Sequence, residues 1–239
     1  MKVLDINQFV SERMKIRPVT NAELDKIQQD MKDKIQQDIK DMKYELTDET
    51  TKTIDGVTLY RIKALKDIPS KGVKKGDLGG WIESYDNLDQ MGDCWIADNA
   101  WVWNNAKVSG NAKVYDTTWV HDNVEVYGNA EVYGDTNMWG SAKVYEDAKI
   151  HGNAKVGGNA KVFGNAQVYG YAEVYGDALV YGDACAYGKA KVYGKAEVGG
   201  NSKVYDNAIV RGNAHVYGTT EVHGNAKVNY VVKDIDVNK

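Results

Sequence analysis

The residue types best suited to catalysis or metal binding are few in this chain: four histidines and two cysteines. Imidazole nitrogens and thiolates are common Zn²⁺ ligands, and both groups can act as catalytic bases or nucleophiles. Such chemistry requires the side chains to converge. The groups in question are His121, His151, His215, His223, Cys94 and Cys185.

The tryptophans suggest another kind of chemistry. Four of the six lie close together in the sequence, and clustered indoles can form an apolar surface that binds a partner. These four are Trp101, Trp103, Trp119 and Trp139. Whether any of these groups meet depends on the elements that carry them.

A six-residue repeat defines those elements. The stretch EVYGNAEVYG, Glu125 to Gly134, contains the same phrase almost twice. Counting in sixes from Ile96 to Val228, nearly every step is Val or Ile, and no insertion or deletion breaks the register. Two residues before each step stands a small side chain, mostly Ala; the variants are Cys94, Thr118, Val124, Thr136, Ser202 and Thr220.

The spacing within each hexad predicts a short strand followed by a bend. Residues two apart face the same side of a strand, so the small and the branched residue both point inward. Gly follows most of the branched residues by two, commonly with Asn or Asp next, and these residues tolerate left-handed backbone. Short strands joined by bends, with no helices between them, predict a coil.

This pattern resembles the hexapeptide-repeat left-handed β-helix superfamily over roughly residues 94–228. The resemblance implies a triangular coil of three hexads, or eighteen residues. The 132 residues from Ile96 to Val228 would then form a little over seven coils. At about 4.8 Å between stacked strands, the prism would be roughly 35 Å long.

The ends of the coil need caps, because unpaired strand edges invite further pairing. Residues 50–93 are predicted to form a β-hairpin, with Asp55 and Gly56 at its turn, and a solenoid cap. Within it, a GGW…DN…GDCWI pattern from Gly79 to Ile96 resembles YdcK-type and phage-encoded β-solenoid proteins. Residues 94–228 are the expected β-helix, and residues 229–239 the expected C-terminal cap.

Residues 1–49 are expected to form an N-terminal helical segment, with a helix from Asn21 to Leu46. Apolar residues fall within roughly 60° of one helical stripe, so this face should be buried against something. The helix could fold back on the solenoid, pair as a coiled coil, or bind another protein. The residues proposed for oligomerisation are Leu24, Ile27, Met31, Ile35, Ile39 and Met42.

Function must lie on the outer faces or the ends, because neither inward row contains a charged residue or a histidine. Aromatic residues recur every eighteen positions on each face, and stacking between successive coils explains most of them. The tryptophans crowd at one end of one face, which favours a protein interface or packing under the N-terminal helix. The predicted binding surface is Trp101, Trp103, Trp119, His121 and Trp139.

The repeat separates the potential metal ligands. His151 and His223 share a face but lie four coils apart, roughly 19 Å, and the other two histidines fall on the other two faces. Cys94 should point inward and Cys185 outward, about 24 Å apart, which is too far for a disulfide. We therefore expect no metal site, no cofactor, and a reducing, cytoplasmic location.

Two functions remain open. The family resemblance implies an acyltransferase, but the coils lack the protruding loop such enzymes use, so only a site between subunits would serve. The favoured hypothesis is a non-enzymatic scaffold or protein-binding module, phage or prophage encoded, with interference in a host defence as one concrete version. We expect a homo-oligomer and a protein partner. The formal charge of −4 and the absence of a long apolar run argue against nucleic acid and membrane.

Overall fold

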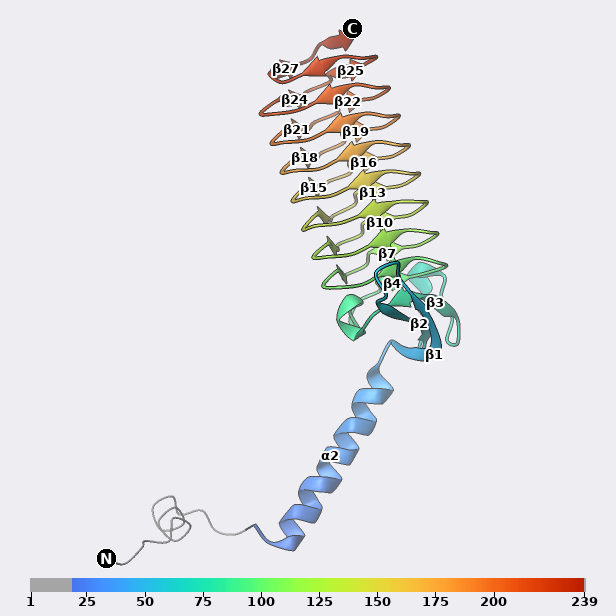
Figure 1. The fold of residues 1–239 in the computed structure, drawn as a ribbon. Helices are drawn as coiled ribbons and strands as arrows, with labels where there is room; N and C mark the ends of the chain where they lie inside the picture. The colour runs from blue at the N-terminus through green and yellow to red at the C-terminus, as the bar shows by residue number, and fades with distance from the viewer. Residues whose placement is uncertain (1–18, 239) are drawn as a thin grey trace, which may run out of the picture. The chain divides into compact units, whose positions relative to one another are not determined.

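The computed structural model describes residues 19–238. They belong to two compact units, residues 1–42 and residues 43–239, which are described separately. The first contains the helix α2, Asn21–Asp41 (Figure 1). The Thr20 hydroxyl accepts a hydrogen bond from the Glu23 amide, and the Glu23 carboxylate accepts one from the Thr20 amide. This reciprocal capping box begins the helix at Asn21.

The helix ends five residues earlier than the expected Leu46. The residues beyond it form strand β1, Tyr44–Lys52, which pairs antiparallel with β2, Thr58–Ala64. Tyr44 is fully buried and its hydroxyl donates to the Leu88 carbonyl, so burial in the cap outweighs continuation of the helix. The hairpin turn is confirmed, with Gly56 at φ +82°.

The second unit is a parallel β-solenoid of three sheets with about eighteen residues per coil, which confirms the predicted fold class. Figure 1 shows its coils stacked from the cap to the C-terminal strands. The eleven-strand sheet contains β1, β2, β3 (Leu78–Ile82), β5 (Trp101–Val102), β8 (Trp119–Val120), β11 (Asn137–Met138), β14 (Lys155–Val156), β17 (Glu173–Val174), β20 (Lys191–Val192), β23 (Ile209–Val210) and β26 (Lys227–Val228).

The other two sheets have the same parallel pairing. The nine-strand sheet contains β4 (Trp95–Ile96), β7 (Lys113–Val114), β10 (Glu131–Val132), β13 (Lys149–Ile150), β16 (Gln167–Val168), β19 (Cys185–Ala186), β22 (Lys203–Val204), β25 (Glu221–His223) and β28 (Asp236–Asn238). The eight-strand sheet contains β6 (Lys107–Val108), β9 (Glu125–Val126), β12 (Lys143–Val144), β15 (Lys161–Val162), β18 (Leu179–Val180), β21 (Glu197–Val198), β24 (His215–Tyr217) and β27 (Val231–Lys233).

The two inward rows fill the coil. Val114, Val132, Ile150 and Val168 follow one another up the nine-strand sheet and are all fully buried. The small-residue row is buried with them, including the polar variants Thr118 and Ser202. The Ser202 hydroxyl donates to the Gly199 carbonyl at 2.6 Å, so this buried hydroxyl is paired.

The corners between rungs require left-handed backbone. Most are glycines, such as Gly134 at φ +80°, where a Cβ would lie only 2.5 Å from the Gly152 carbonyl oxygen one coil further on. Where Asp replaces glycine, its carboxylate binds the next coil instead. Asp122, at φ +60°, accepts a hydrogen bond from the Gly140 amide at 2.8 Å.

The coil begins earlier than the hexad pattern indicates. β3 pairs in parallel with β5, and Leu88 bridges to Val108, so Ile82 and Leu88 form the first inward positions. Between them lies the short 3₁₀ helix η2 (Tyr85–Asn87); another, η1 (Pro69–Lys71), lies earlier in the cap. A side chain at Gly79 or Gly80 would overlap the buried Ile62 or Ile96. This close approach explains the two glycines of the GGW pattern.

Asn87 explains the DN part of the same pattern. It is fully buried, and its Oδ1 accepts from the amides of Glu83 and Ser84 at 3.1 and 2.9 Å. Its Nδ2 donates to the carbonyls of Asn104 and Ala106, both at 2.9 Å. One amide group thus satisfies four backbone groups at the short helix η2, between the inward positions Ile82 and Leu88.

The C-terminal segment adds shortened rungs to the coil. Val232 pairs with Val216, and Val237 pairs with Val222, at offsets of 16 and 15 residues in place of 18. The sequence predicted that the six-residue repeat ends before this segment, and the shorter offsets between paired strands agree with that prediction. The segment covers the last strands of two sheets, and β26 ends the third.

Candidate binding surface

The tryptophans lie on the eleven-strand sheet near the cap. Register pairs Trp81 of β3 with Trp101 of β5, and Trp101 with Trp119 of β8, so the three occupy one outward column. The indoles of Trp101 and Trp119 stack with centroids 5.7 Å apart and planes inclined by 15°. The Arg61 guanidinium lies over the Trp81 ring, 5.0 Å from its centroid, at the cap end of the column.

A second column runs beside the first. The Trp103 indole stacks on the His121 imidazole at 4.6 Å and meets Trp101 and Trp119 edge-on at 6.4 and 6.3 Å. These rings leave Trp103 only 6% exposed, whereas Trp119 is 43% exposed. Trp103 is therefore packed beneath the neighbouring rings, and Trp119 is the exposed indole of the two.

The structure brings together four of the five predicted surface residues through direct ring contacts: Trp101, Trp103, Trp119 and His121. Trp139 lies one coil further along the His121 column and packs over Gly157, where any side chain would overlap its indole. We call these five residues the tryptophan surface.

A groove beside Trp119 adds polar groups that the sequence analysis missed. The next residue in the Trp101–Trp119 column is Asn137, whose short side chain leaves one indole face uncovered by a stacked ring. The His121 Nε2 lies 3.3 Å from Asn137 Oδ1, and Thr117 donates to Asp135 at the neighbouring corner. The groove is lined by Asn99, Trp101, Thr117, Trp119, Asp135, Thr136, Asn137 and Lys155.

This arrangement can accept a flat apolar group against the indole and hydrogen bonds at the rim. Positions 101, 119, 137 and 155 recur at eighteen residues, so the repeat alone could have located Asn137 and Lys155. The corner residues Thr117 and Asp135 could have been found by the same counting.

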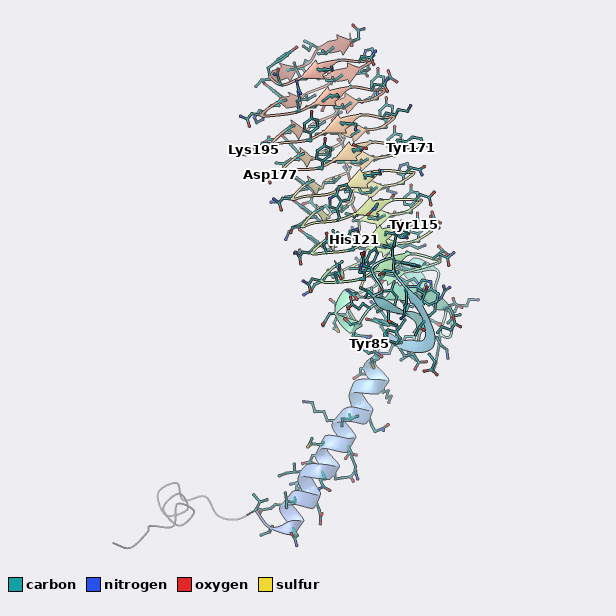
Figure 2. The ribbon with its side chains drawn as sticks, in the orientation of Figure 1. Tyr85, Tyr115, His121, Tyr171, Asp177 and Lys195 are labelled. Atoms are coloured by element: carbon teal, nitrogen blue, oxygen red, sulfur yellow. The ribbon has the colours of Figure 1, made fainter. Side chains whose placement is uncertain are left out.

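The other two faces carry aromatic ladders, as predicted. On the nine-strand sheet, each ring from Tyr115 to His223 stacks on the next at 4.7–5.0 Å: Tyr115, Tyr133, His151, Tyr169, Tyr187, Tyr205 and His223. On the eight-strand sheet the stacked rings are Tyr127, Tyr145, Phe163 and Tyr181. Figure 2 shows side chains projecting outward along the solenoid, with Tyr115 and His121 labelled.

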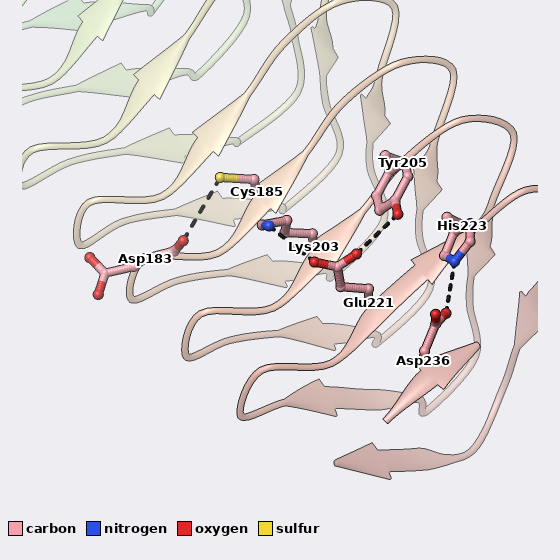
Figure 3. Close-up of polar contacts among 7 residues, drawn as sticks. All are labelled: Asp183, Cys185, Lys203, Tyr205, Glu221, His223 and Asp236. Atoms are coloured by element: carbon pink, nitrogen blue, oxygen red, sulfur yellow. Dashed lines mark hydrogen bonds and ion pairs between the residues drawn. The ribbon is translucent and has the colours of Figure 1, made fainter. Parts of the chain in front are cut away.

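Charged residues beside the ladders are paired along the same columns. Glu221 accepts from the Lys203 ammonium and from the Tyr205 hydroxyl, both at 3.0 Å (Figure 3). These hydrogen bonds, above all that of Lys203, lower the pKa of the Glu221 carboxyl. Desolvation, with the Glu221 charge, raises the pKa of Tyr205 to about 12. Both shifts favour an ionised Glu221 carboxylate and a neutral Tyr205 hydroxyl at neutral pH.

The histidines are distributed over the three sheets, as the repeat predicts. His223 lies 2.7 Å from Asp236, a His–carboxylate pair that sequence reasoning missed because Asp236 belongs to a shortened rung, β28 (Figure 3). Such a pair can orient an imidazole as a base. Among the described residues, no group of three or more His, Cys, Asp and Glu side chains is arranged to hold a metal ion.

The cysteines take the predicted orientations. Cys94 is fully buried in the small-residue row, and Cys185 is half-buried on the outside of the nine-strand sheet. In Figure 3 the Cys185 thiol points toward the Asp183 carbonyl, 3.8 Å away. Burial raises the pKa of both thiols.

The helix stripe is exposed within its own unit. Leu24, Ile27, Met31 and Ile35 are all about half exposed, and Met42 is half-buried. Ile39 lies in α2, but its side chain is outside the described part of the structure, as are residues 1–18 of the expected N-terminal segment. No helix among residues 19–238 has the length and apolar character of a membrane span.

No protein-family model matches the sequence, and a search of curated proteins found no match.

Proposed function

We propose that this protein is a non-catalytic β-solenoid module that binds a protein partner through the tryptophan surface. The observation that carries the proposal is the 43% exposure of Trp119, a large indole held in place by its stack on Trp101. Aromatic anchors fixed on a rigid scaffold lose little conformational entropy on binding and dominate many interfaces.

The alternative is a hexapeptide-repeat acyltransferase with a site between subunits. The three-sheet coil with eighteen residues per turn supports the relationship to that superfamily, whose members include enzymes. Against catalysis, each rung between Ile96 and Val228 follows the last after six residues, which leaves no room for a protruding loop. Small-molecule sites are concave pockets, so without such a loop an acyltransferase site would have to form between subunits.

The resemblance of the GGW…DN…GDCWI segment to phage-encoded solenoid proteins supports a phage or prophage origin. On that basis the partner would be a host or phage protein, with a component of a host defence as one candidate. The electrostatic character of the groove, with Asp135 and Lys155 at its rim, suits a partner that presents both charges around an apolar centre.

The test is quantitative capture of partners from extracts of the native host, comparing the parent chain with Trp119→Ala. We expect the parent chain to capture one partner that Trp119→Ala does not capture. The affinity of the variant for that partner should be at least about 30-fold lower, the equivalent of about 2 kcal/mol. Tyr217→Ala is the matched control, because Tyr217 is 37% exposed on the eight-strand sheet. Equal capture by all three proteins, or turnover of acyl-coenzyme A by the parent chain, would refute the proposal.

A further inference from the structure

Lys43 and Cys94 form a buried pair that the proposed binding function does not use. Lys43 precedes β1 in the cap, and Cys94 precedes β4 in the first coil. Their exposures are 5% and 0%, and Lys43 Nζ lies 3.2 Å from Cys94 Sγ. A nucleophilic nitrogen and an oxidisable sulfur are therefore in contact inside the protein.

The surroundings hold both groups in place. Lys43 Nζ donates to the Cys94 carbonyl at 2.9 Å, and to the carbonyls of Gly92 and Met91 at 3.3 and 3.4 Å. The Lys43 amide donates to Gln90 Oε1 at 2.7 Å. These contacts hold Nζ against Sγ.

We propose that Lys43 and Cys94 form an oxidative cross-linking site, in which a peroxide joins Nζ to Sγ as a sulfenamide. In the first step the thiol and hydrogen peroxide give a sulfenic acid, Sγ–OH, and one water. In the second, the neutral Lys43 amine attacks Sγ, the N–S bond forms and the S–O bond breaks. The leaving hydroxide takes a proton from the nitrogen as the second water. The sulfur is oxidised by two electrons, and the peroxide is reduced to two waters.

The geometry favours this fate over the others open to a sulfenic acid. A disulfide would require a second thiol, but Cys185 lies on the outer side of the nine-strand sheet in a later coil. Further oxidation needs a second peroxide to reach a buried sulfur, whereas the amine is already in contact. The first peroxide would approach beside Met91, which is 74% exposed and whose carbonyl lies 3.7 Å from Cys94 Sγ.

The cross-link would join the cap to the coil across a sequence separation of 51 residues. Closing a loop of this length reduces the entropy of the unfolded chain, so the oxidised protein should melt at a higher temperature. The site would thus strengthen the end of the solenoid nearest the tryptophan surface under oxidative conditions.

The reaction should be faster at higher pH, because it uses the thiolate and the neutral amine. Burial raises the pKa of the Cys94 thiol; the Lys43 charge acts in the opposite direction, and the Asp89 carboxylate reinforces the rise. The 3.2 Å contact between Nζ and Sγ determines which two groups react, and the pH changes only the rate of the cross-linking reaction.

The test is peptide mapping of the full chain after treatment with hydrogen peroxide, carried out without reductant. We expect a peptide containing Lys43 linked to one containing Cys94, with the net loss of two hydrogen atoms, and release of the two peptides by dithiothreitol. Lys43→Arg keeps a cation but supplies no comparable nucleophile, so its Cys94 should remain reactive toward a sulfenic-acid probe. Cys185→Ser should cross-link like the parent.

The proposal is overturned if peroxide converts Cys94 of the parent chain to unlinked sulfinic acid. It is equally overturned if Cys94 stays a thiol under conditions that oxidise Cys185, or if Lys43→Arg forms the same linked species. Because the parent chain gives the deciding result, the conclusion does not depend on either variant folding.

Discussion

In the regular coils, outward side chains eighteen residues apart lie next to each other, and the pair of residue types determines the contact they make. Tyr beside Tyr gives a stacked ladder, and Lys beside Glu gives an ion pair, as at Lys143 and Glu125, 2.8 Å apart. Exposed ion pairs of this kind contribute little individually. The aromatic ladders should contribute more to the rigidity of the faces, since each inner ring is covered on both sides.

His151 allows the effect of stacking in a ladder to be tested at a single residue. Its imidazole lies 4.9 Å from both Tyr133 and Tyr169, and burial, with the Lys149 charge, lowers its pKa below the 6.5 of an unperturbed histidine. The unfolded chain then binds more protons than the folded one as pH falls below about 6.5. The stability that His151 removes therefore grows as the pH falls from about 6.5 to its lowered folded pKa and stays constant below it, whereas above about pH 6.5 it removes none.

The measurement is urea unfolding of the parent and of His151→Tyr at several values between about pH 8 and about pH 5. The parent should lose more stability than the variant on acidification, because the variant has no imidazole in the ladder. The difference between the two proteins isolates this residue from the other histidines. Parallel curves would show that His151 titrates alike in the folded and unfolded chains.

At the scale of elements, strands of only two or three residues persist because each strand inside a sheet is hydrogen-bonded to the coils on both sides. The hexad pattern predicted these strands and their inward rows from Ile96 to Val228, since period and burial agree at every rung. It could not predict that Ile82 and Leu88 continue the rows, because the step from Leu88 to Ile96 is eight residues and breaks the six-residue register. Nor could it show that neighbouring rings bury Trp103.

The inward rows can be tested within one strand. Val168 of β16 is fully buried, whereas its neighbour Gln167 points outward and is half-buried. Val168→Asp places an unpaired carboxylate in the coil and should cost at least about 3 kcal/mol of unfolding free energy. Gln167→Asp, with the same new side chain one residue away, should change it by less than about 1 kcal/mol. Equal losses in chemical denaturation would show that the two positions do not face opposite sides.

At the scale of the whole molecule, two surfaces have the character of interfaces: the tryptophan surface and the apolar stripe of α2. The first could be located from sequence because the repeat fixes which residues share a column. The partner could not, because the groove at Asn137 and Lys155 constrains shape and charge but does not identify a ligand. The stripe could also be located from sequence. Its apolar side chains are exposed within their own unit, so we still expect a partner to cover them.

We predict that the stripe pairs with a second copy of the chain and makes the protein a dimer or trimer. Leu24, Ile27, Met31 and Ile35 are each 45–59% exposed, and association is the usual way to bury such a face. Replacing Ile27, Met31 and Ile35 together by Glu should give a monomer by light scattering at micromolar concentration. The control replaces Lys26, Gln36 and Lys40 by Glu, which also adds acidic charge but away from the stripe, and it should remain associated. A monomeric parent chain, or a stripe variant that keeps the parent's mass, would show that α2 does not hold the copies together.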